Sequence, residues 1–252
     1  MRRVVCHTLI VSVSVLVAVL CAIHVAAAAP RPDTSPRTLL RRILQDTTSL
    51  GGRGALTSLA VGGLAAALVH PGDANAVKAF RPEQAPEEAL DGGSIAGNGW
   101  IQSGTAAGVY AIGLLAHRPG AAAFGSELVE AQAIDGVLTQ GLKFAVNRTR
   151  PNGGRYSFPS GHASATFATA DVIEQHFGWR AGALAYAGAA YVLLSRVGEH
   201  AHYPSDTIFG AALGIASARS VAARHRRLAL RGFAVVPMAG PDGVTVLLTR
   251  SR

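Results

Sequence analysis

Basic residues, histidines and two acids gather in three short blocks of the chain. The blocks read KFAVNRTRP at 143–151, FPSGHASA at 158–165 and SRVGEHAHYPSD at 195–206. The rest of the chain is dominated by Ala, Gly, Val and Leu. Cations placed beside hydroxyl groups and imidazoles can bind a phosphoryl group and transfer it. We therefore treat the three blocks together as one candidate site.

The first block offers two cations, Lys143 and Arg150, which stand seven positions apart. Seven positions are nearly two helical turns, so both cations would share one face of a helix that persists to Thr149. Pro151 would then end that helix. The neighbours of Lys143 are apolar, which favours a buried anion site over a solvated basic face. For Arg148, in contrast, the solvated basic face is the preferred interpretation.

The second block places Ser160, Gly161 and His162 where a turn enters a helix. Backbone N–H groups at a helix N-terminus bind anions, and Gly161 lets a phosphate approach closely. The hydroxyl group of Ser160 can add a hydrogen bond to the anion. Ser160 can equally be the N-cap of the helix, and the two roles are compatible. His162 is the candidate acid for protonating a leaving oxygen.

The third block supplies a further cation, Arg196, and two histidines that compete for the role of nucleophile. Five residues separate Arg196 from His202, and Asp206 follows four positions after His202. Pro204 is a good first helical residue, so Asp206 falls in the first turn of the last long helix. From there we expect its carboxylate to accept the Nδ1 proton of His202, which leaves Nε2 as the attacking atom. His200 is interpreted as a pocket-wall residue, and a purely helix-dipole role for Asp206 is the alternative.

Together these residues describe a phosphoryl-transfer site. Lys143, Arg150 and Arg196, with the donors of the second block, would stabilise charge on the phosphoryl oxygens. His202 would attack phosphorus to form a phosphohistidine, His162 would protonate the leaving alcohol, and water would hydrolyse the intermediate. The acids are scattered and no residues have metal-ligand spacing. We therefore expect neither a metal nor another cofactor.

The order and internal spacing of the three blocks resemble the signature of the type 2 phosphatidic acid phosphatase and vanadium-dependent haloperoxidase superfamily. The resemblance covers about a quarter of the chain. It implies a helical bundle and the same metal-free histidine mechanism. Two functions are consistent with it: a phosphatase for phosphate monoesters, with lipid phosphates and isoprenoid pyrophosphates among the candidates, or a vanadate-dependent haloperoxidase. A third hypothesis, from another class of function, is a non-catalytic binder of phosphate or lipid head groups. Binding alone needs only the cations, so the histidines and Asp206 argue against the third.

Composition narrows the fold and the partners. A chain of 252 residues suits one domain. Hydrophobic residues make up 49% of it but aromatic residues only 6%, which favours helices packed through small side chains over a β-sandwich. The net charge of +8 comes almost entirely from scattered arginines. No basic stripe with interleaved aromatic residues is present, so nucleic acid is not an expected partner.

The first residues indicate export. Residues 1–29 have a charged start, a long apolar run and small residues before Pro30, which is typical of a secretion signal. An uncleaved anchor is the alternative. Cys6 and Cys21 both lie in this segment, so the mature chain would hold no disulfide. We expect a periplasmic or membrane-associated protein with its active site outside the cytoplasm.

The remainder divides into a linker with an amphipathic helix (30–53), a phosphatase domain (54–228) and a tail (229–252). The predicted fold is an all-α helical bundle with a small C-terminal β-hairpin. Helices are expected over 38–50, 55–70, 94–117, 127–147, 162–177, 181–195 and 204–226. The segments 73–99 and 152–156 are expected to form the pocket walls.

Two of these helices, 55–70 and 94–117, carry no charge. Ala and Gly contribute little to membrane insertion, so we interpret both as buried helices of a water-soluble bundle. The first is also shorter than the ~20 residues that a span requires. Partial embedding in a membrane is the alternative.

Overall fold

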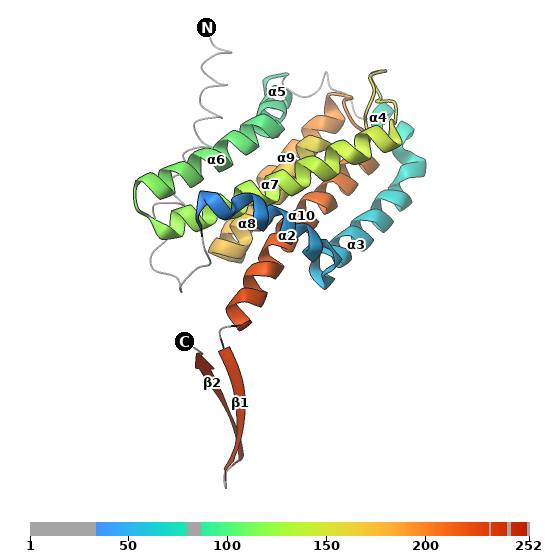
Figure 1. Cartoon of the computed structure of the whole chain (residues 1–252). Coiled ribbons are helices and arrows are strands. Elements are labelled where there is room, and N and C mark those ends of the chain that lie inside the picture. The colour runs from blue at the N-terminus through green and yellow to red at the C-terminus, as the bar shows by residue number, and fades with distance from the viewer. Residues whose placement is uncertain (1–33, 80–86, 232, 241–242, 251–252) are drawn as a thin grey trace.

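The structure, a computed structural model, describes residues 34–79, 87–231, 233–240 and 243–250 (Figure 1). The predicted signal at 1–29 lies outside the described residues. The elements are η1 Pro36–Thr38, α2 Leu39–Thr47, η2 Thr48–Gly51, α3 Arg53–Val69, η3 His70–Gly72, α4 Asp73–Ala79, α5 Glu87–Ala96, α6 Gly99–Leu115, α7 Pro119–Val146, α8 Gly161–Phe177, α9 Trp179–Gly198, α10 Pro204–Arg231, β1 Phe233–Gly240 and β2 Gly243–Arg250.

The helices form one bundle, as the composition and the blocks predict. Helix α10 packs against α3, α7 and α8, while α6 pairs with α7 and α9 pairs with α8. Strands β1 and β2 pair antiparallel beyond the end of α10, with Phe233 opposite Arg250. Figure 1 shows this pair extending away from the bundle, over the residues for which the sequence predicts a hairpin.

Small residues allow the helices to come very close. A Cβ atom at Gly62 of α3 would lie 2.1 Å from the side chain of Ala212 in α10. A Cβ atom at Gly210 would lie 2.5 Å from the carbonyl oxygen of Ser160, and one at Gly214 would lie 2.0 Å from that of Ser164. The backbone of α10 therefore touches the first turn of α8. This contact fixes the second block against the helix that carries Asp206.

The main core lies between α7 and its neighbours. Its buried side chains are Ala106, Val109, Phe124, Leu128, Ala131, Ile134, Val172, Ala218 and Val221. Phe124 also meets the ring of Phe177 edge-on, at a centroid distance of 5.1 Å. This packing holds α7 and α8 in register, so the block at the end of α7 and the block at the start of α8 have fixed relative positions.

Helix α3 contradicts the prediction of a buried helix over 55–70. The segment Arg53–Ala79 is long and apolar enough to cross a membrane, yet only 11% of its most apolar window is buried. Leu64 is 63% exposed and Leu68 is 74% exposed. The prediction was wrong because the small residues of α3 face α10, which turns the leucines outward. Small residues at the helix contact and large apolar residues outside are typical of helices packed in a membrane.

The segment 94–117 is not one buried helix either. Asn98 interrupts it, because its side chain accepts hydrogen bonds from the N–H groups of Trp100 (2.9 Å) and Ile101 (3.4 Å) and so caps α6. Helix α6 buries one face, which includes Val109, and leaves Leu115 80% exposed. The polar residue that the sequence shows as an interruption is therefore the boundary between two helices.

Candidate active site

Helix α7 ends before the first block is complete. Its last residue is Val146, and Asn147 follows in the left-handed conformation, with φ 47°, as the C-cap. The predicted continuation to Thr149 was wrong, so Lys143 and Arg150 do not share a helical face. Lys143 lies in the last turn of α7, whereas Arg150 lies in the loop that follows. Folding of that loop, rather than helical periodicity, brings the two cations together.

Lys143 is almost buried, with 9% of its surface exposed. Its Nζ atom donates a hydrogen bond to the carbonyl oxygen of Tyr156 at 2.8 Å. Burial and the neighbouring charge of Arg150 lower the pKa of Lys143 to about 8. The ammonium group therefore points into the loop between the first and second blocks, where a positive charge is costly unless an anion arrives.

The second block forms the start of α8, as predicted. Ser160 is the N-cap, and its buried hydroxyl accepts a hydrogen bond from the N–H of Ala163 at 3.4 Å. A Cβ atom at Gly161 would lie 3.4 Å from Thr139 and 3.8 Å from the Cε atom of Lys143. The lysine of the first block thus lies against the helix N-terminus of the second. This pairing of a cation with free N–H groups suits an anion.

His162 follows in the first turn of α8. Burial and the charges of Arg196, Arg150 and Lys143 lower its pKa to about 4. A Cβ atom at Gly97 would lie 3.0 Å from the Cβ of His162, so the connection between α5 and α6 packs directly on the imidazole. That connection belongs to the predicted pocket wall at 73–99.

His202 is 1% exposed, between α9 and α10. Burial and the charges of Lys143, Arg150 and Arg196 hold its pKa well below the ordinary value for histidine. The same three cations lower the pKa of His162. Three predicted cations from the first and third blocks therefore converge on both predicted histidines, although up to 59 sequence positions separate them.

The hydrogen bond that orients His202 differs from the prediction. Its Nδ1 atom lies 2.6 Å from the carbonyl oxygen of Ser157, and 3.9 Å from Oδ2 of Asp206. A carbonyl oxygen only accepts, so Nδ1 carries the proton and Nε2 keeps its lone pair. The tautomer is the predicted one, but its direct partner is Ser157 and not Asp206.

Asp206 does lie in the first turn of α10, as predicted, but other donors occupy its carboxylate. Oδ2 accepts hydrogen bonds from the hydroxyl of Ser157 at 2.5 Å and from the N–H of Tyr203 at 3.0 Å. Oδ1 accepts one from Arg148 at 2.6 Å. These three partners occupy the carboxylate, and its Oδ2 atom stays 3.9 Å from Nδ1 of His202.

Arg148 is the residue that sequence reasoning missed. The predicted solvated basic side chain instead pairs with both Asp206 and Asp73, at 2.6 and 2.9 Å. Its guanidinium also lies 4.1 Å from the centre of the Tyr203 ring. Asp73 stands 75 positions earlier in the chain. No local pattern around Arg148 could have indicated that partner.

The third block folds over Arg196. The carbonyl oxygen of Arg196 accepts the N–H groups of Ala201 at 3.1 Å and His202 at 3.2 Å. Its guanidinium pairs with Glu199, a partner that was not predicted. His200 adopts a left-handed backbone (φ 52°), and its carbonyl accepts the N–H of Asn152 at 3.1 Å. His200 therefore joins the third block to the predicted wall at 152–156.

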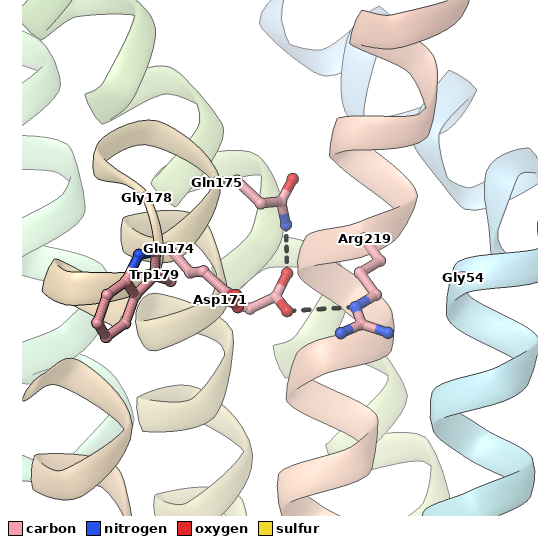
Figure 2. Close-up of a pocket in the computed structure, with 7 residues that line it drawn as sticks. All are labelled: Gly54, Asp171, Glu174, Gln175, Gly178, Trp179 and Arg219. Carbon is pink, nitrogen blue, oxygen red and sulfur yellow. Dashed lines mark hydrogen bonds and ion pairs between the residues drawn. The ribbon is translucent and has the colours of Figure 1, made fainter. Parts of the chain in front are cut away.

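A separate pocket of about 500 Å³ lies at the other end of α8, about 25 Å along the helix (Figure 2). Gly54, Asp171, Glu174, Gln175, Gly178, Trp179 and Arg219 line it. Asp171 is held there by Tyr186 at 2.9 Å and Arg219 at 3.3 Å. None of the predicted site residues reaches this pocket. Among the described residues, no group of three or more His, Cys, Asp or Glu side chains lies close enough together to hold a metal ion.

Comparison with known proteins supports the resemblance seen in the three blocks. Residues 152–229 match the model of the PAP2 superfamily. A Lipid A 1-phosphatase from Porphyromonas gingivalis is 34% identical over 87 residues, which are 33% of this chain and 20% of that protein. The chain thus spans about a fifth of the length of this curated relative.

The fold has a counterpart among solved structures. The crystal structure of a transmembrane PAP2 type phosphatidylglycerolphosphate phosphatase from Bacillus subtilis superposes with a TM-score of 0.52 and 19% sequence identity. The match covers 78% of this chain and 98% of the other. The helical arrangement described above is therefore shared beyond the matched segment 152–229.

Proposed function

We propose that the chain is a phosphatase that cleaves phosphate monoesters through His202, a function that the match of residues 152–229 to the PAP2 superfamily model supports. One observation carries the proposal: Lys143, Arg150 and Arg196 act on both His162 and His202. Both imidazoles therefore lie near the same three cations, which oppose protonation of either ring. An anion bound among these residues would offset that repulsion.

In the proposed reaction, the three cations and the N–H groups at Gly161 hold the phosphoryl oxygens. Nε2 of His202 attacks phosphorus, because the carbonyl of Ser157 retains the proton at Nδ1. A P–N bond forms as the P–O bond to the leaving group breaks. His162 donates its proton to the departing oxygen and then takes a proton from the water that hydrolyses the phosphohistidine. The residues named supply every proton, and no step calls for a metal.

The substrate class that we propose is a lipid-linked phosphate. The outward leucines of α3 favour contact with a membrane. Trp100, which is 89% exposed, lies in the first turn of α6, three residues after Gly97, the glycine that packs against His162. Trp side chains favour the interface between lipid and water. The active site would then open close to the lipid head groups. Both proteins reported above carry names of lipid phosphatases, which is consistent with this class.

The proposed location is the outer side of the cytoplasmic membrane. The sequence of residues 1–29 supports export, and the apolar surface of α3 supports retention at the membrane. Of the two locations expected from the sequence, periplasmic or membrane-associated, this proposal takes the second. Extraction that requires detergent, after a high-salt wash has failed, is the expected behaviour.

The test is hydrolysis by the purified full chain of p-nitrophenyl phosphate and of a lipid phosphate in mixed micelles. We expect phosphate release from both, retention of activity in EDTA, and competitive inhibition by vanadate, which mimics the five-coordinate transition state. Loss of activity in EDTA that zinc or magnesium restores would contradict the metal-free mechanism. Bromide oxidation by peroxide in the presence of vanadate, without hydrolysis, would identify a haloperoxidase instead. Phosphate binding without turnover would identify a binder.

A further inference from the structure

We propose that Arg148, held by Asp73, is a positioning residue for the nucleophile His202. This inference rests on the proposed function, in which His202 attacks phosphorus. The relevant group is the Arg148 bridge, defined as the guanidinium of Arg148 with the carboxylates of Asp73 and Asp206. It lies behind the imidazole and not at the phosphate.

The Arg148 bridge is built from three distant parts of the chain. Nη1 of Arg148 donates to Oδ1 of Asp206 at 2.6 Å and to the hydroxyl of Ser205 at 2.9 Å. Nη2 donates to Oδ2 of Asp73 at 2.9 Å. Asp73 in turn accepts the N–H of Ser205 at 3.0 Å and its hydroxyl at 2.5 Å. The start of α4, the loop after α7 and the start of α10 therefore meet at one guanidinium.

Arg148 has little capacity left for a phosphate. Its two Nη atoms donate to protein oxygens, and one face of the guanidinium lies on the ring of Tyr203 at 4.1 Å. The side chain is 21% exposed. Lys143, Arg150 and Arg196 lower the pKa of both catalytic histidines, whereas Arg148 is not among the causes of either shift. Its positive charge is paired with the two carboxylates.

Two routes connect Arg148 to the imidazole, and both pass through Ser157. The carbonyl oxygen of Arg148 accepts the N–H of Ser157 at 2.8 Å. The carboxylate that Arg148 holds accepts the hydroxyl of Ser157 at 2.5 Å. The carbonyl of Ser157 then accepts the Nδ1 proton of His202 at 2.6 Å. Displacing Arg148 therefore moves the one carbonyl that sets the direction of Nε2.

The shape of the side chain matters in this arrangement. A guanidinium is a planar fork that can hold two carboxylates and a hydroxyl at once, whereas an ammonium group is a point charge. Arg148→Lys keeps the charge but loses the fork. Asp73→Asn keeps the size of the side chain and an acceptor for Ser205, but removes the negative charge that pairs with Nη2 of Arg148. The two variants test the same bridge from opposite ends.

The kinetic test compares these variants with Arg219→Lys in full-length protein in detergent. Arg219 bonds Asp171 and Ser58 at the far end of the bundle, so its loss is matched in chemistry but remote from His202 (Figure 2). For Arg148→Lys and Asp73→Asn we expect kcat to fall about 10- to 100-fold, as for other residues that orient a catalytic ligand, with KM and vanadate inhibition within about twofold. Arg219→Lys should keep the wild-type kcat. A tenfold rise in KM or in the vanadate inhibition constant would show that Arg148 binds phosphate, and would overturn the proposal.

A double variant tests the route. If Arg148 acts through Asp206, Arg148→Lys combined with Asp206→Asn should lose no more than about twofold beyond Asp206→Asn alone. Losses that multiply would mean that Arg148 acts independently of Asp206, which contradicts the bridge.

A measurement without turnover separates this inference from the proposed function. In protein labelled with ¹⁵N-histidine, the Nδ1 proton of His202, bonded to Ser157, should give a slowly exchanging downfield signal that His202→Ala removes. We expect Arg219→Lys to retain that signal, and Arg148→Lys and Asp73→Asn to lose it. A wild-type chain that hydrolyses no phosphate ester would contradict the proposed function, but this measurement could still be made. An unchanged signal in both bridge variants would contradict the positioning role of Arg148, whether or not the protein hydrolyses phosphate esters.

Discussion

The carboxylate of Glu199 forms an ion pair with the guanidinium of Arg196, and its Oε2 atom lies 2.8 Å from Nη1 of the arginine. Glu199 lies only three positions after Arg196, where α9 ends, and its side chain is 24% exposed. Burial raises its pKa, and the charge of Asp91 on α5 acts in the same direction, while Arg196 opposes both. One of the three cations that we propose to bind phosphate therefore shares its charge with an acid of the protein, and a phosphate dianion bound there would have that acid as a neighbour.

Replacing that acid should tighten anion binding. Glu199→Gln keeps the size of the side chain but removes a negative charge beside Arg196. At an effective dielectric constant near 20, the repulsion between the Glu199 carboxylate and a bound anion is worth at least about 1 kcal/mol. We therefore expect the vanadate inhibition constant to fall about fivefold. Vanadate titration of p-nitrophenyl phosphate hydrolysis measures this. A weaker response to vanadate would indicate instead that Glu199 aims Arg196 at the phosphate.

The choice between neighbouring histidines is open to direct test. We expect His202→Ala to lose about a thousandfold or more of kcat, as for the removal of other nucleophiles, and to abolish the acid-labile phosphoenzyme after rapid quench. His200→Ala should keep most activity, because His200 meets the wall at 152–156 through its carbonyl group and not through its ring. Trapping of the phosphoenzyme in His202→Ala but not in His200→Ala would reverse the assignment.

Substrates with different leaving groups can distinguish the proposed acid, His162, from the proposed nucleophile, His202. p-Nitrophenolate departs with little protonation, whereas an alkoxide does not. His162→Ala should therefore still form the phosphoenzyme from p-nitrophenyl phosphate, but it should lose hydrolysis of an alkyl phosphate by about 100-fold or more. Equal losses on the two substrates would remove His162 from the acid role.

The pH profile follows from the two histidines and Lys143. His202 acts as the neutral form, and its pKa lies well below the ordinary value, so it stays competent far into acid. His162 acts as the protonated form, and its pKa in the free enzyme is about 4. For an alkyl phosphate, kcat/KM should therefore decline as pH rises above about 4, which places the optimum on the acidic side of neutrality.

The same profile with p-nitrophenyl phosphate should extend further. This substrate needs little help from His162, so its upper limit is set by the loss of charge at Lys143, whose pKa is about 8. Parallel titrations of the two substrates from pH 3 to 10 check both statements. Profiles that superpose would show that proton donation by His162 does not govern the reaction.

Trp100 should matter only for substrates in a membrane. It is 89% exposed, near the connection that packs on His162, whereas Trp179 is 71% exposed at the other end of α8. We expect Trp100→Ala to raise the apparent KM for a lipid phosphate in vesicles about fivefold and to leave p-nitrophenyl phosphate unchanged. Trp179→Ala is the matched control. A rise in KM for the soluble ester would mean that Trp100 shapes the pocket itself.

Short-range spacing predicted the local structure of the candidate site where the partners are close in sequence. Ser160 as an N-cap and Asp206 in the first turn of α10 follow from residues within a few positions of each helix start. The Nδ1 partner of His202 was beyond this reasoning. It is a main-chain carbonyl 45 positions away, and a carbonyl group has no sequence signature.

The same limit explains Arg148 and α3. Arg148 looks solvated because its partner Asp73 comes from another part of the bundle. For α3, composition indicates only the average hydropathy. Whether the leucines are buried or exposed depends on which face of the helix the glycines occupy. Gly62 lies against Ala212, so the leucines had to face outward. Tertiary contacts decide which face of a helix is buried, and the sequence alone does not contain those contacts.

The Arg148 bridge also decides how far the protein can be shortened for expression. The stretch that matches the family model, 152–229, contains both candidate histidines and Arg196, but begins after Lys143 and Arg150. A fragment trimmed to that stretch would therefore hold the proposed nucleophile without two of the three cations that we propose to bind phosphate. Restoring them from α7 onward would still leave Arg148 facing an absent Asp73. Under the proposed mechanism, we expect the smallest active fragment to begin before α4, more than seventy residues upstream of the stretch that matches the family model.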